Sequence, residues 1–231
     1  MRNANDCEIT QDKYRLAREH NVFIAKKKLA ENVYSGARMK GIDVTFAETQ
    51  AIVDGVNVAR LRVREIVVIH DLHAGWKQML RHVDDPMTLD LVCAIHAAVS
   101  RAGRRLQNDD VSISGTAHMP PSPRQADVAS DIDAILRAPT CATAKALELY
   151  AHCCKSQLFE DGNMRTACIV ANHVLIANGC GLLTVGDRDV APLQAKLRDY
   201  CDDDAHKSAL LRFLYDRCVH RANFEYGAQK V

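Results

Sequence analysis

Apolar residues recur at intervals of three and four along most of this chain, and this helical period constrains its fold more than any other feature. In residues 89–104, for example, Leu91, Val92, Ile95 and Val99 fall on one face of a helix. Short alternating segments, which would indicate strands, are rare. The pattern therefore predicts an all-α fold with at most a small β element.

The segments with this period are 9–33, 46–54, 57–82, 89–104, 141–156, 164–178, 189–200 and 205–220. Several carry boundary signals. Thr45 is placed to cap the second segment and Gly55 to end it. Gly103 is expected to end 89–104, and an aspartate to cap the segment that begins at 189. These signals make the helical prediction more specific than the period alone.

One stretch breaks the pattern. Residues 111–119 alternate around Gly115 and run into Pro120-Pro121-Ser122-Pro123. Alternation followed by prolines predicts a short strand or hairpin. We find no internal repeat and no low-complexity linker, so the sequence predicts one domain over residues 1–231.

The balance of acidic and basic residues argues against a highly charged partner such as nucleic acid or an anionic membrane. Among 231 residues, Lys and Arg number 30, and Asp and Glu number 29. Such a balance gives no overall field for nucleic acid or an anionic membrane, and we expect neither as a partner. The basic clusters at 26–28 and 101–105 are expected to be solvated helix faces.

Cysteine usage and the N-terminus indicate the compartment. The nine cysteines include no Cys-x-x-Cys pair, and most lie in apolar runs, which is typical of buried thiols in a reducing environment. His70 and His73 have metal-like spacing, but no second pair accompanies them. Because the N-terminus is polar and no run reaches transmembrane length, we expect a cytoplasmic protein. A secreted effector without a cleavable signal is left open.

Residues 157–165 read Gln-Leu-Phe-Glu-Asp-Gly-Asn-Met-Arg and precede an apolar helical stretch. The carboxylate of Asp161 is suited to a divalent cation. The Gly162-Asn163 turn lets backbone N–H groups converge on an anion at the start of the next helix, and Arg165 can grip a phosphate. The run predicts a site for a phosphorylated ligand, although nothing between 155 and 165 can accept a proton near neutral pH.

This run resembles the active-site motif of the Fic (Fic/Doc, Fido) family, H-x-F-x-[DE]-G-N-x-R-x-x-R, which lies on a loop between two central helices. The matching residues are Phe159, Asp161, Gly162, Asn163 and Arg165. The similarity extends over about 35–218. It includes a flap-like stretch at 115–123, a first core helix at 88–98 with His96, an inhibitory-element-like stretch at 35–45 and the closing run at 182–200.

The resemblance implies a mainly helical Fic fold with a β-hairpin flap. N-terminal helices would occupy 1–87, the core 88–200, the flap 111–123, the active-site loop 157–165, and a C-terminal helix and tail 201–231. It also implies transfer of a nucleotide-derived phosphoryl group, usually AMP, to a Ser, Thr or Tyr hydroxyl of a target protein. The implied cofactors are Mg²⁺ and ATP or another phosphate-containing donor.

Site roles follow from the same resemblance. Asp161 would bind the metal. Gly162, Asn163, Met164 and Arg165 would hold the phosphates, and the flap residues Gly115, Thr116, Ala117 and His118 would dock the target. Met164 replaces a frequent glycine, which backbone binding tolerates.

Three positions depart from the family pattern. Gln157 stands in place of the motif histidine, and an amide cannot act as a base. Cys168 stands in place of the second arginine. Lys40, before Gly41, stands in place of an inhibitory glutamate that pairs with that arginine in many members. The losses at 40 and 168 agree, because the glutamate has no role without its arginine.

Simpler interpretations stay open for several of these residues. Asp161 and Arg165 also suit an ordinary helix start, and Asn163 an ordinary turn. As a replacement base, His118 on the flap is better placed than His152 or His173, and all three are expected to be structural.

Two functions are consistent with this sequence. The first is a Fic-type protein nucleotidylyltransferase (AMPylation-like) with weakened or altered activity. The alternative is a catalytically inactive Fic-fold binding or regulatory module, a pseudoenzyme. The sequence leaves a homo-oligomer open, and neither supports nor excludes a toxin–antitoxin role for the N-terminal helices.

Overall fold

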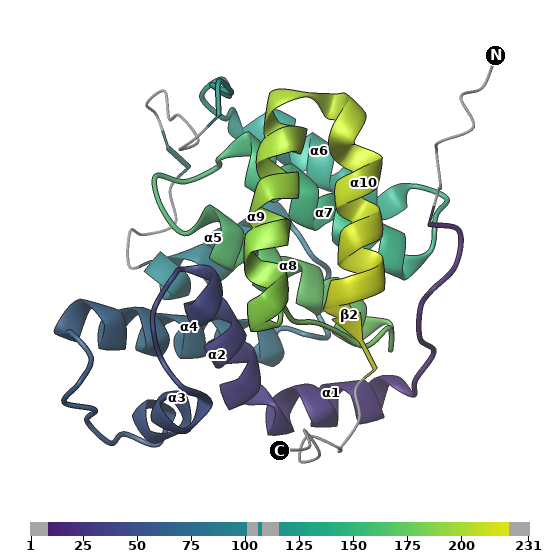
Figure 1. Cartoon of the computed structure of the whole chain (residues 1–231). Helices are drawn as coiled ribbons and strands as arrows, with labels where there is room; N and C mark the ends of the chain where they lie inside the picture. Colours follow the sequence, from purple (N-terminus) through teal and green to yellow (C-terminus); the bar gives the residue numbers. More distant parts are fainter. Residues whose placement is uncertain (1–8, 101–105, 108–115, 222–231) are drawn as a thin grey trace.

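The computed structural model describes residues 9–100, 106–107 and 116–221 (Figure 1). Its helices are α1 (Arg18–Lys27), α2 (Leu29–Met39), α3 (Phe46–Val53), α4 (Val63–Arg81), α5 (Leu89–Ser100), α6 (Gln125–Arg137), α7 (Ala142–Ser156), α8 (Asn163–Ala177), α9 (Asp187–Asp202) and α10 (Lys207–Phe213). A 3₁₀ turn (Asp204–His206) precedes α10, and a π turn (Leu214–Cys218) follows it. Within these residues the only strands are β1 (Leu182–Leu183) and β2 (Val219–His220), so the predicted all-α class is confirmed.

Helix α8 lies at the centre of the molecule (Figure 1). Its sequence is apolar on nearly every face, and only Met164 and Ala177 of its residues are not buried. A helix of this kind needs neighbours on all sides. Helix α7 makes the most extensive packing against it, and α1, α4 and α5 cover its other faces. The N-terminus of α8, where the loop 157–165 ends, is thereby held by the core.

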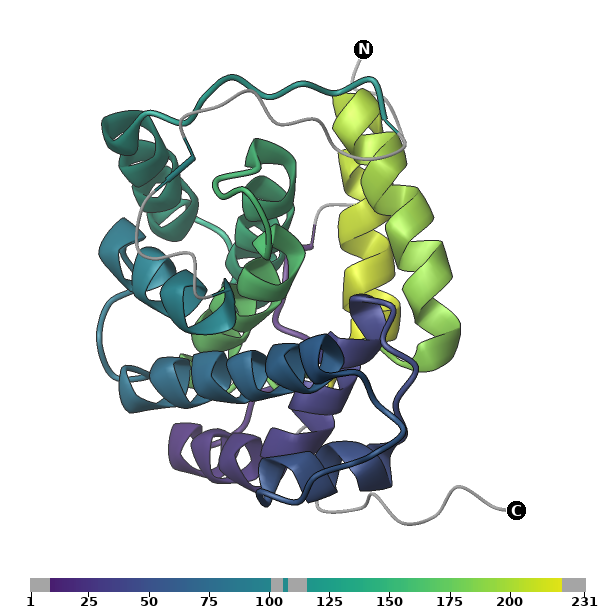
Figure 2. The ribbon, with the colours of Figure 1, turned by 90° about the vertical axis from the view of Figure 1, so that its left-hand side faces the viewer.

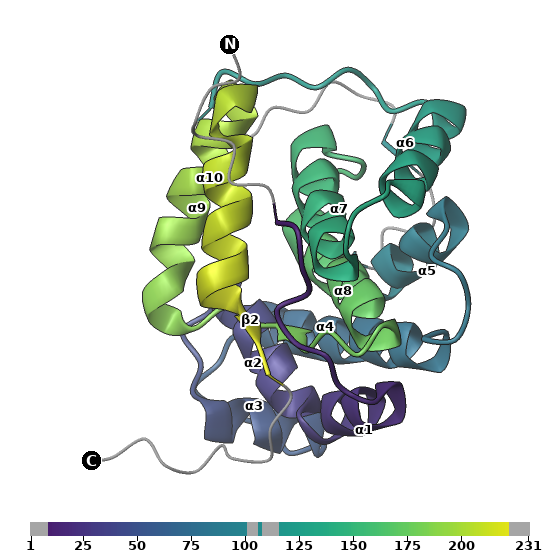
Figure 3. The same cartoon turned by 90° about the vertical axis from the view of Figure 1, so that its right-hand side faces the viewer.

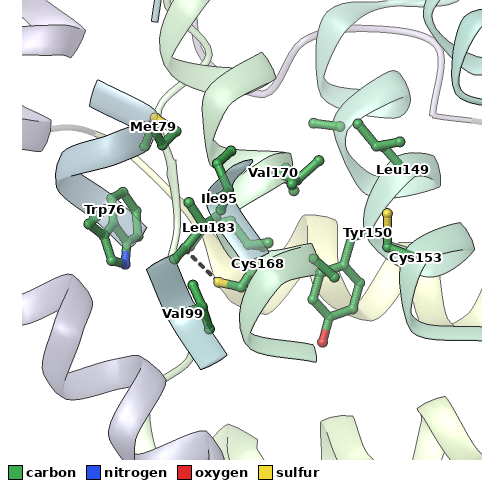
Figure 4. Packing of buried hydrophobic residues seen from close by; sticks show 14 of the residues in the cluster. Trp76, Met79, Ile95, Val99, Leu149, Tyr150, Cys153, Cys168, Val170 and Leu183 are labelled. Carbon is green, nitrogen blue, oxygen red and sulfur yellow. Dashed lines mark hydrogen bonds between the residues drawn. The ribbon is translucent and has the colours of Figure 1, made fainter. Parts of the chain in front are cut away.

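The core around α8 is continuous and includes buried apolar side chains from Ile24 to Val219. Figure 4 shows Trp76 and Val99 lying near Cys168 and Leu183. Gly75 lets α4 approach α5 closely, since a Cβ there would lie 2.4 Å from Val99 Cγ2. This close packing fixes α5, which forms one wall of the loop described below.

A second layer covers the other side of α7. Helices α9 and α10 lie side by side (Figures 2 and 3) and contact α7. At their base β1 pairs with β2 antiparallel, with Leu182 opposite His220. The Asn172 side chain of α8 holds β1, because its amide accepts from Leu183 N (2.9 Å) and donates to Leu183 O (2.8 Å).

The segment before α1 is extended, so the predicted helix over 9–33 is wrong over residues 9–17, and the rest is divided at Lys28 between α1 and α2. Figure 3 shows this segment running past α7 and α10. Asp12 accepts a hydrogen bond from Thr143 N (2.8 Å). Lys13 Nζ donates to the carbonyls of Tyr215, Asp216 and Val219. These long-range bonds outweigh the weak local helical preference of 9–17.

Of the other predicted helix boundaries, one is confirmed and two are wrong. Thr45 and Glu48 form a complete capping box at the start of α3, as expected. Helix α4 begins at Val63 rather than 57. Helix α9 begins at Asp187 rather than 189, and its N-cap is Gly186, which has no side chain, so the predicted aspartate cap is wrong. Helix α6 was not predicted, and the closing segment 205–220 ends in a π turn and a strand.

The predicted hairpin falls mostly on residues that the structure does not describe. Residues 111–115 and the predicted helix end at Gly103 lie outside the described ranges. Residues 116–119 form a bend without strand pairing. No helix in the described part of the chain is both long and apolar enough to cross a bilayer.

Candidate functional site

The loop begins where α7 ends, at a residue with an unusual backbone. Gln157 has φ 43° and ψ 56°, and it is the only non-glycine residue with positive φ in the described ranges. Gln107 holds this turn from outside, through Nε2 to Gln157 O (2.5 Å) and through N to Leu158 O (3.0 Å). A left-handed residue persists when its surroundings determine it, so the loop is a fixed structure.

The side chain of Gln157 is bonded at both ends of its amide. Nε2 donates to Cys154 O (2.6 Å), and Oε1 accepts from Asn163 Nδ2 (3.0 Å). A primary amide has no basic lone pair near neutral pH. This side chain therefore orients the loop and cannot accept a proton from a substrate hydroxyl.

Asn163 connects the loop to α8. Its Oδ1 accepts from Phe159 N (2.9 Å) and its Nδ2 donates to Phe159 O (2.5 Å). Because these bonds and the bond to Gln157 occupy the side chain, Asn163 can offer a ligand only its backbone N–H. The simpler interpretation of Asn163, as a residue that shapes the turn, is thus supported for the side chain.

The start of α8 presents backbone donors. Gly162 has φ 83° and precedes the first helical residue. The first intrahelical bond is Thr166 N to Gly162 O (2.8 Å), so the N–H groups of residues 163–165 have no carbonyl partner within the helix. Donors of this kind, together with the helix dipole, favour an anion.

Asp161 lies between two cations. Its Oδ1 is 2.9 Å from Lys40 Nζ, and its Oδ2 is 2.8 Å from Arg165 Nη2. Partial burial alone would raise the pKa of this carboxyl. The hydrogen bond from Lys40 and the charge of Arg165 outweigh burial and hold the pKa below its ordinary value. The carboxylate is ionised near neutral pH.

Arg165 is not a surface residue, because its side chain is only 4% exposed. Nη1 donates to Val99 O (3.1 Å) and Nη2 to Asp161, while Nε is buried with no hydrogen-bond partner. A guanidinium with an unsatisfied buried donor is costly. Burial leaves the guanidinium with one donor that the described structure does not satisfy.

His96 lies directly beneath the loop, and sequence reasoning did not assign it a site role. Its ring stacks on Phe159, with centroids 3.5 Å apart and an interplanar angle of 3°. Nε2 is 2.8 Å from Ser100 Oγ and Nδ1 is 3.2 Å from Thr166 Oγ1. Burial, followed by the charge of Arg165, lowers its pKa to about 4. His96 is a neutral, buried support for the loop, whose place in the first core helix was its only sequence signal.

Lys40 reaches the loop from a distant part of the chain. Helix α2 ends there because Gly41, with φ 83°, and Ile42 donate to Arg38 O and Ala37 O in a Schellman motif. Ser35, in the same helix, exchanges hydrogen bonds with the backbone of Val185. The stretch that resembles an inhibitory element therefore contacts the loop through a lysine.

Cys168 lies two turns from Asp161 and faces the core. Its Sγ points at Leu183 O, 3.8 Å away (Figure 4). Burial raises the pKa of this thiol to about 12. No second cation is supplied to the loop from this position of α8.

The flap residues are placed only in part. Gly115 lies outside the described residues. Ala117 N donates to Asp202 Oδ1 (2.8 Å), and His118 N is 3.3 Å from Thr116 Oγ1. His118 Nε2 is 3.1 Å from Lys155 O, which places the ring against the last turn of α7.

The other candidate bases are structural. His173 Nε2 donates to His82 O (2.9 Å) from a buried position. His152 lies 4.0 Å from Asp131 on the α6 side of α7. Neither residue has a hydrogen bond to the loop in the described structure.

The residues present do not fit a divalent cation held by the protein. No group of three His, Cys, Asp or Glu side chains that could hold a metal occurs in the described ranges. Asp161 is the loop carboxylate with hydrogen-bond partners, and its two oxygens are bonded by Lys40 and Arg165. Mg²⁺ at a nucleotide site is usually held by one or two carboxylates together with phosphate oxygens, at about 2.0–2.1 Å, so the occupied oxygens of Asp161, and not the lack of a three-ligand group, argue against the ion here.

Comparison with known proteins relates this geometry to a family. Residues 86–175 match the Fic/DOC family. A solved Fic-domain signalling protein from Bacteroides thetaiotaomicron superposes with a TM-score of 0.68 at 15% identity, covering 86% of this chain and 88% of that one. Fic-1 (residues 134–508) from C. elegans gives 0.66 at 17%, covering 83% and 60%. A Fic family protein from Desulfovibrio desulfuricans gives 0.62 at 16%, covering 86% and 63%.

These similarities concern the fold. The chain spans less than two thirds of the C. elegans and Desulfovibrio chains it matches. No curated protein matches it by sequence.

Proposed function

This chain has a Fic fold and matches the Fic/DOC family over residues 86–175, and from that premise we propose that it is a slow Fic-type protein nucleotidylyltransferase. It binds a phosphate-bearing nucleotide at the loop 157–165. It transfers a nucleotide-derived phosphoryl group to a Ser, Thr or Tyr hydroxyl of a target protein, at a rate far below that of members with the motif histidine. The target oxygen forms a new bond to phosphorus, the bond to the rest of the donor breaks (releasing pyrophosphate when AMP comes from ATP), and the hydroxyl proton passes to solvent.

One observation carries the binding part of this proposal. The N–H groups at the start of α8 and the buried Arg165, with its unpartnered Nε, converge on the turn at Gly162. Backbone donors, a helix N-terminus and a guanidinium are the groups that recognise phosphate. They also stabilise the charge that develops during phosphoryl transfer.

The slow rate follows from Gln157. Deprotonation of the attacking hydroxyl needs an acceptor within hydrogen-bond reach, and an amide cannot serve. Loss of a general base typically lowers a rate by about 10²–10⁴-fold. Positioning and electrostatic stabilisation remain, so the reaction is slowed rather than abolished.

Gln157→His is the direct test. Histidine is among the residues enriched at positive φ, so the backbone at 157 accepts it. We expect label to be transferred from radiolabelled ATP to lysate proteins at least about 100-fold faster than with wild type, the lower end of what a general base supplies. Gln125→His, on the exposed face of α6, controls for the added imidazole.

The loop itself is tested in the same assay with Gly162→Val. If wild type and Gln157→His both label no protein above Gly162→Val, transferase activity is excluded.

A second candidate, a catalytically silent nucleotide-binding module, is favoured by a different observation. Both ends of the Gln157 amide are bonded, and Cys168 supplies no cation. Calorimetry with ATP separates the two candidates. Binding without label in either wild type or Gln157→His supports the silent module, whereas label that Gly162→Val removes contradicts it.

A further inference from the structure

The ion pair between Lys40 and Asp161 places a second cation at the loop beside Arg165. The Lys40 ammonium is 2.9 Å from Asp161 Oδ1 and its side chain is 41% exposed. The other carboxylate oxygen bonds Arg165. Asp161 is the residue that the family resemblance assigns to a metal ion, and here both its oxygens are neutralised by side chains.

We infer that Lys40 replaces the divalent cation, so that this chain binds the phosphates of its nucleotide without a metal ion. The inference rests on the nucleotide site proposed above. Lys40 and Arg165 would grip the phosphate chain from two sides, and the N-terminus of α8 would hold it from below.

Charge and donor count support this assignment. Lys40 and Arg165 against Asp161 leave one net positive charge, to which the dipole of α8 adds. An ammonium has three N–H donors, and the bond to Asp161 uses one. Arg165 adds its positive charge from beneath the turn, where its side chain is 4% exposed. An anion thus finds two cations and several unused donors at one turn.

A divalent ion would compete with Lys40 for the same oxygen. Mg²⁺ binds carboxylate oxygens at about 2.0–2.1 Å, and at that position it would lie close to the ammonium. Two like charges a few ångströms apart repel, although solvent weakens the repulsion because the Asp161 side chain is 62% exposed. The pair therefore disfavours Mg²⁺ at Asp161 for as long as Lys40 stays in place.

The fold holds Lys40 in this position. Gly41 ends α2 immediately after it, and α2 is fixed to α9 through Asp187, which accepts from Tyr34 Oη (2.9 Å) and Arg38 Nε (3.1 Å). Cys168 on α8 stands where the family has its second arginine and brings no positive charge. Lys40, at the end of α2, brings a second positive charge to the loop instead. The site is assembled from two elements that are far apart in sequence.

Isothermal titration calorimetry with ATP, in EDTA and in Mg²⁺, tests the inference. For wild type we expect dissociation constants within about threefold of each other in the two buffers. Lys40→Gln should weaken binding in EDTA about tenfold, the loss typical of one charge-assisted hydrogen bond. Lys40→Arg should retain ATP binding in EDTA. Lys26 is an exposed lysine of α1, and Lys26→Gln should leave ATP binding unchanged.

Asp161→Asn gives an independent readout. If Lys40 is the phosphate ligand, removing the carboxylate leaves ATP binding in EDTA as tight as in wild type or tighter. Asp133→Asn is the matched control, because Asp133 also pairs with an arginine at i+4 and 2.8 Å.

The outcomes separate this inference from the proposed function. Wild-type binding that requires Mg²⁺ and is lost in Asp161→Asn overturns the inference and leaves the nucleotide site intact. Equal binding by wild type and Lys40→Gln in EDTA also overturns it. Absence of ATP binding in both buffers overturns the inference and the nucleotide site together.

Discussion

At the scale of single residues, the loop depends on side chains that hold it rather than react. Gln157 and Asn163 bond each other and the backbone, and His96 stacks under Phe159. Each is polar and buried or partly buried, and each has its partners, as buried polar groups must. Arg165 is the exception, because its Nε is left without a partner.

His96 makes stability depend on pH. Its pKa in the folded chain is about 4, below the ordinary 6.5, because burial disfavours the charged ring. Between pH 6.5 and pH 4, the unfolded chain therefore binds a proton at His96 that the folded chain does not bind. The stability that the neutral ring contributes is present above pH 6.5 and is lost as pH falls toward 4. We expect the loss from His96 to be about 2 kcal/mol between pH 8 and pH 5.

The measurement is urea unfolding of wild type and His96→Phe at both pH values. Phenylalanine keeps a ring against Phe159 and cannot titrate. Between pH 8 and pH 5, the free energy of unfolding should fall by about 2 kcal/mol less in His96→Phe than in wild type. The other histidines titrate in both proteins, so their contribution cancels when the two losses are subtracted. Equal losses in the two proteins would show that His96 does not titrate in this way.

At the scale of elements, the N-terminus of α8 depends on Gly162. Its φ of 83° lies in the left-handed region, and a Cβ there would make only ordinary contacts with Ser100, Arg165 and His96. Substitution is therefore disfavoured by the backbone and not by lack of space. The same conformation occurs at Gly55, with φ 86° and open surroundings, in the turn after α3.

Gly162→Val and Gly55→Val form a matched pair. β-branched residues at positive φ are strongly disfavoured, so each variant should lose about 1–3 kcal/mol of stability. Only Gly162→Val should lose ATP binding, because only there do the helix N–H groups face the proposed ligand. Thermal unfolding and calorimetry measure the two effects. Comparable loss of ATP binding in Gly55→Val would mean that general destabilisation, and not the loop, weakens binding.

At the scale of the whole molecule, the N-terminal extended segment ties the two ends of the described chain together. Lys13 donates to two carbonyls of the C-terminal π turn and one of β2, and Asp12 holds the start of α7 through Thr143. These bonds join residues about 200 positions apart and link the N-terminal segment both to α7 and to the segment after α10.

Lys13→Met should therefore lower global stability. Methionine keeps the apolar stem but leaves the three carbonyls without this donor, at a cost of about 1–2 kcal/mol. Thermal unfolding should show a lower midpoint, while Lys26→Met on the exposed face of α1 should leave it unchanged. If Lys13→Met and Lys26→Met had the same unfolding midpoint, the hydrogen bonds of Lys13 would not contribute to global stability. ATP binding, which depends on α2 and α8, should be the same in wild type and Lys13→Met.

Much of the fold was predictable because its signals are local. The helices α3, α5, α7 and α8 follow from period and boundary residues, such as the Thr45 capping box. The Fic resemblance, carried by residues 157–165 and the order of the helices, is confirmed by the family match and the solved structures. Helix α6 and the strands β1 and β2 were missed. A two-residue strand has no period of its own, and β1 is fixed by Asn172, a residue of another element.

The chain by itself determined a helical protein with a Gly-Asn turn ahead of an apolar helix, and the absence of a base at position 157. These properties are set by residue type and spacing. Three further properties depend on the folded arrangement: the burial of Arg165 with an unpartnered donor, the support of the loop by His96, and the bond from Lys40 to Asp161 across 121 positions of sequence. Such pairings depend on how packed helices bring distant side chains together, and no local pattern encodes them.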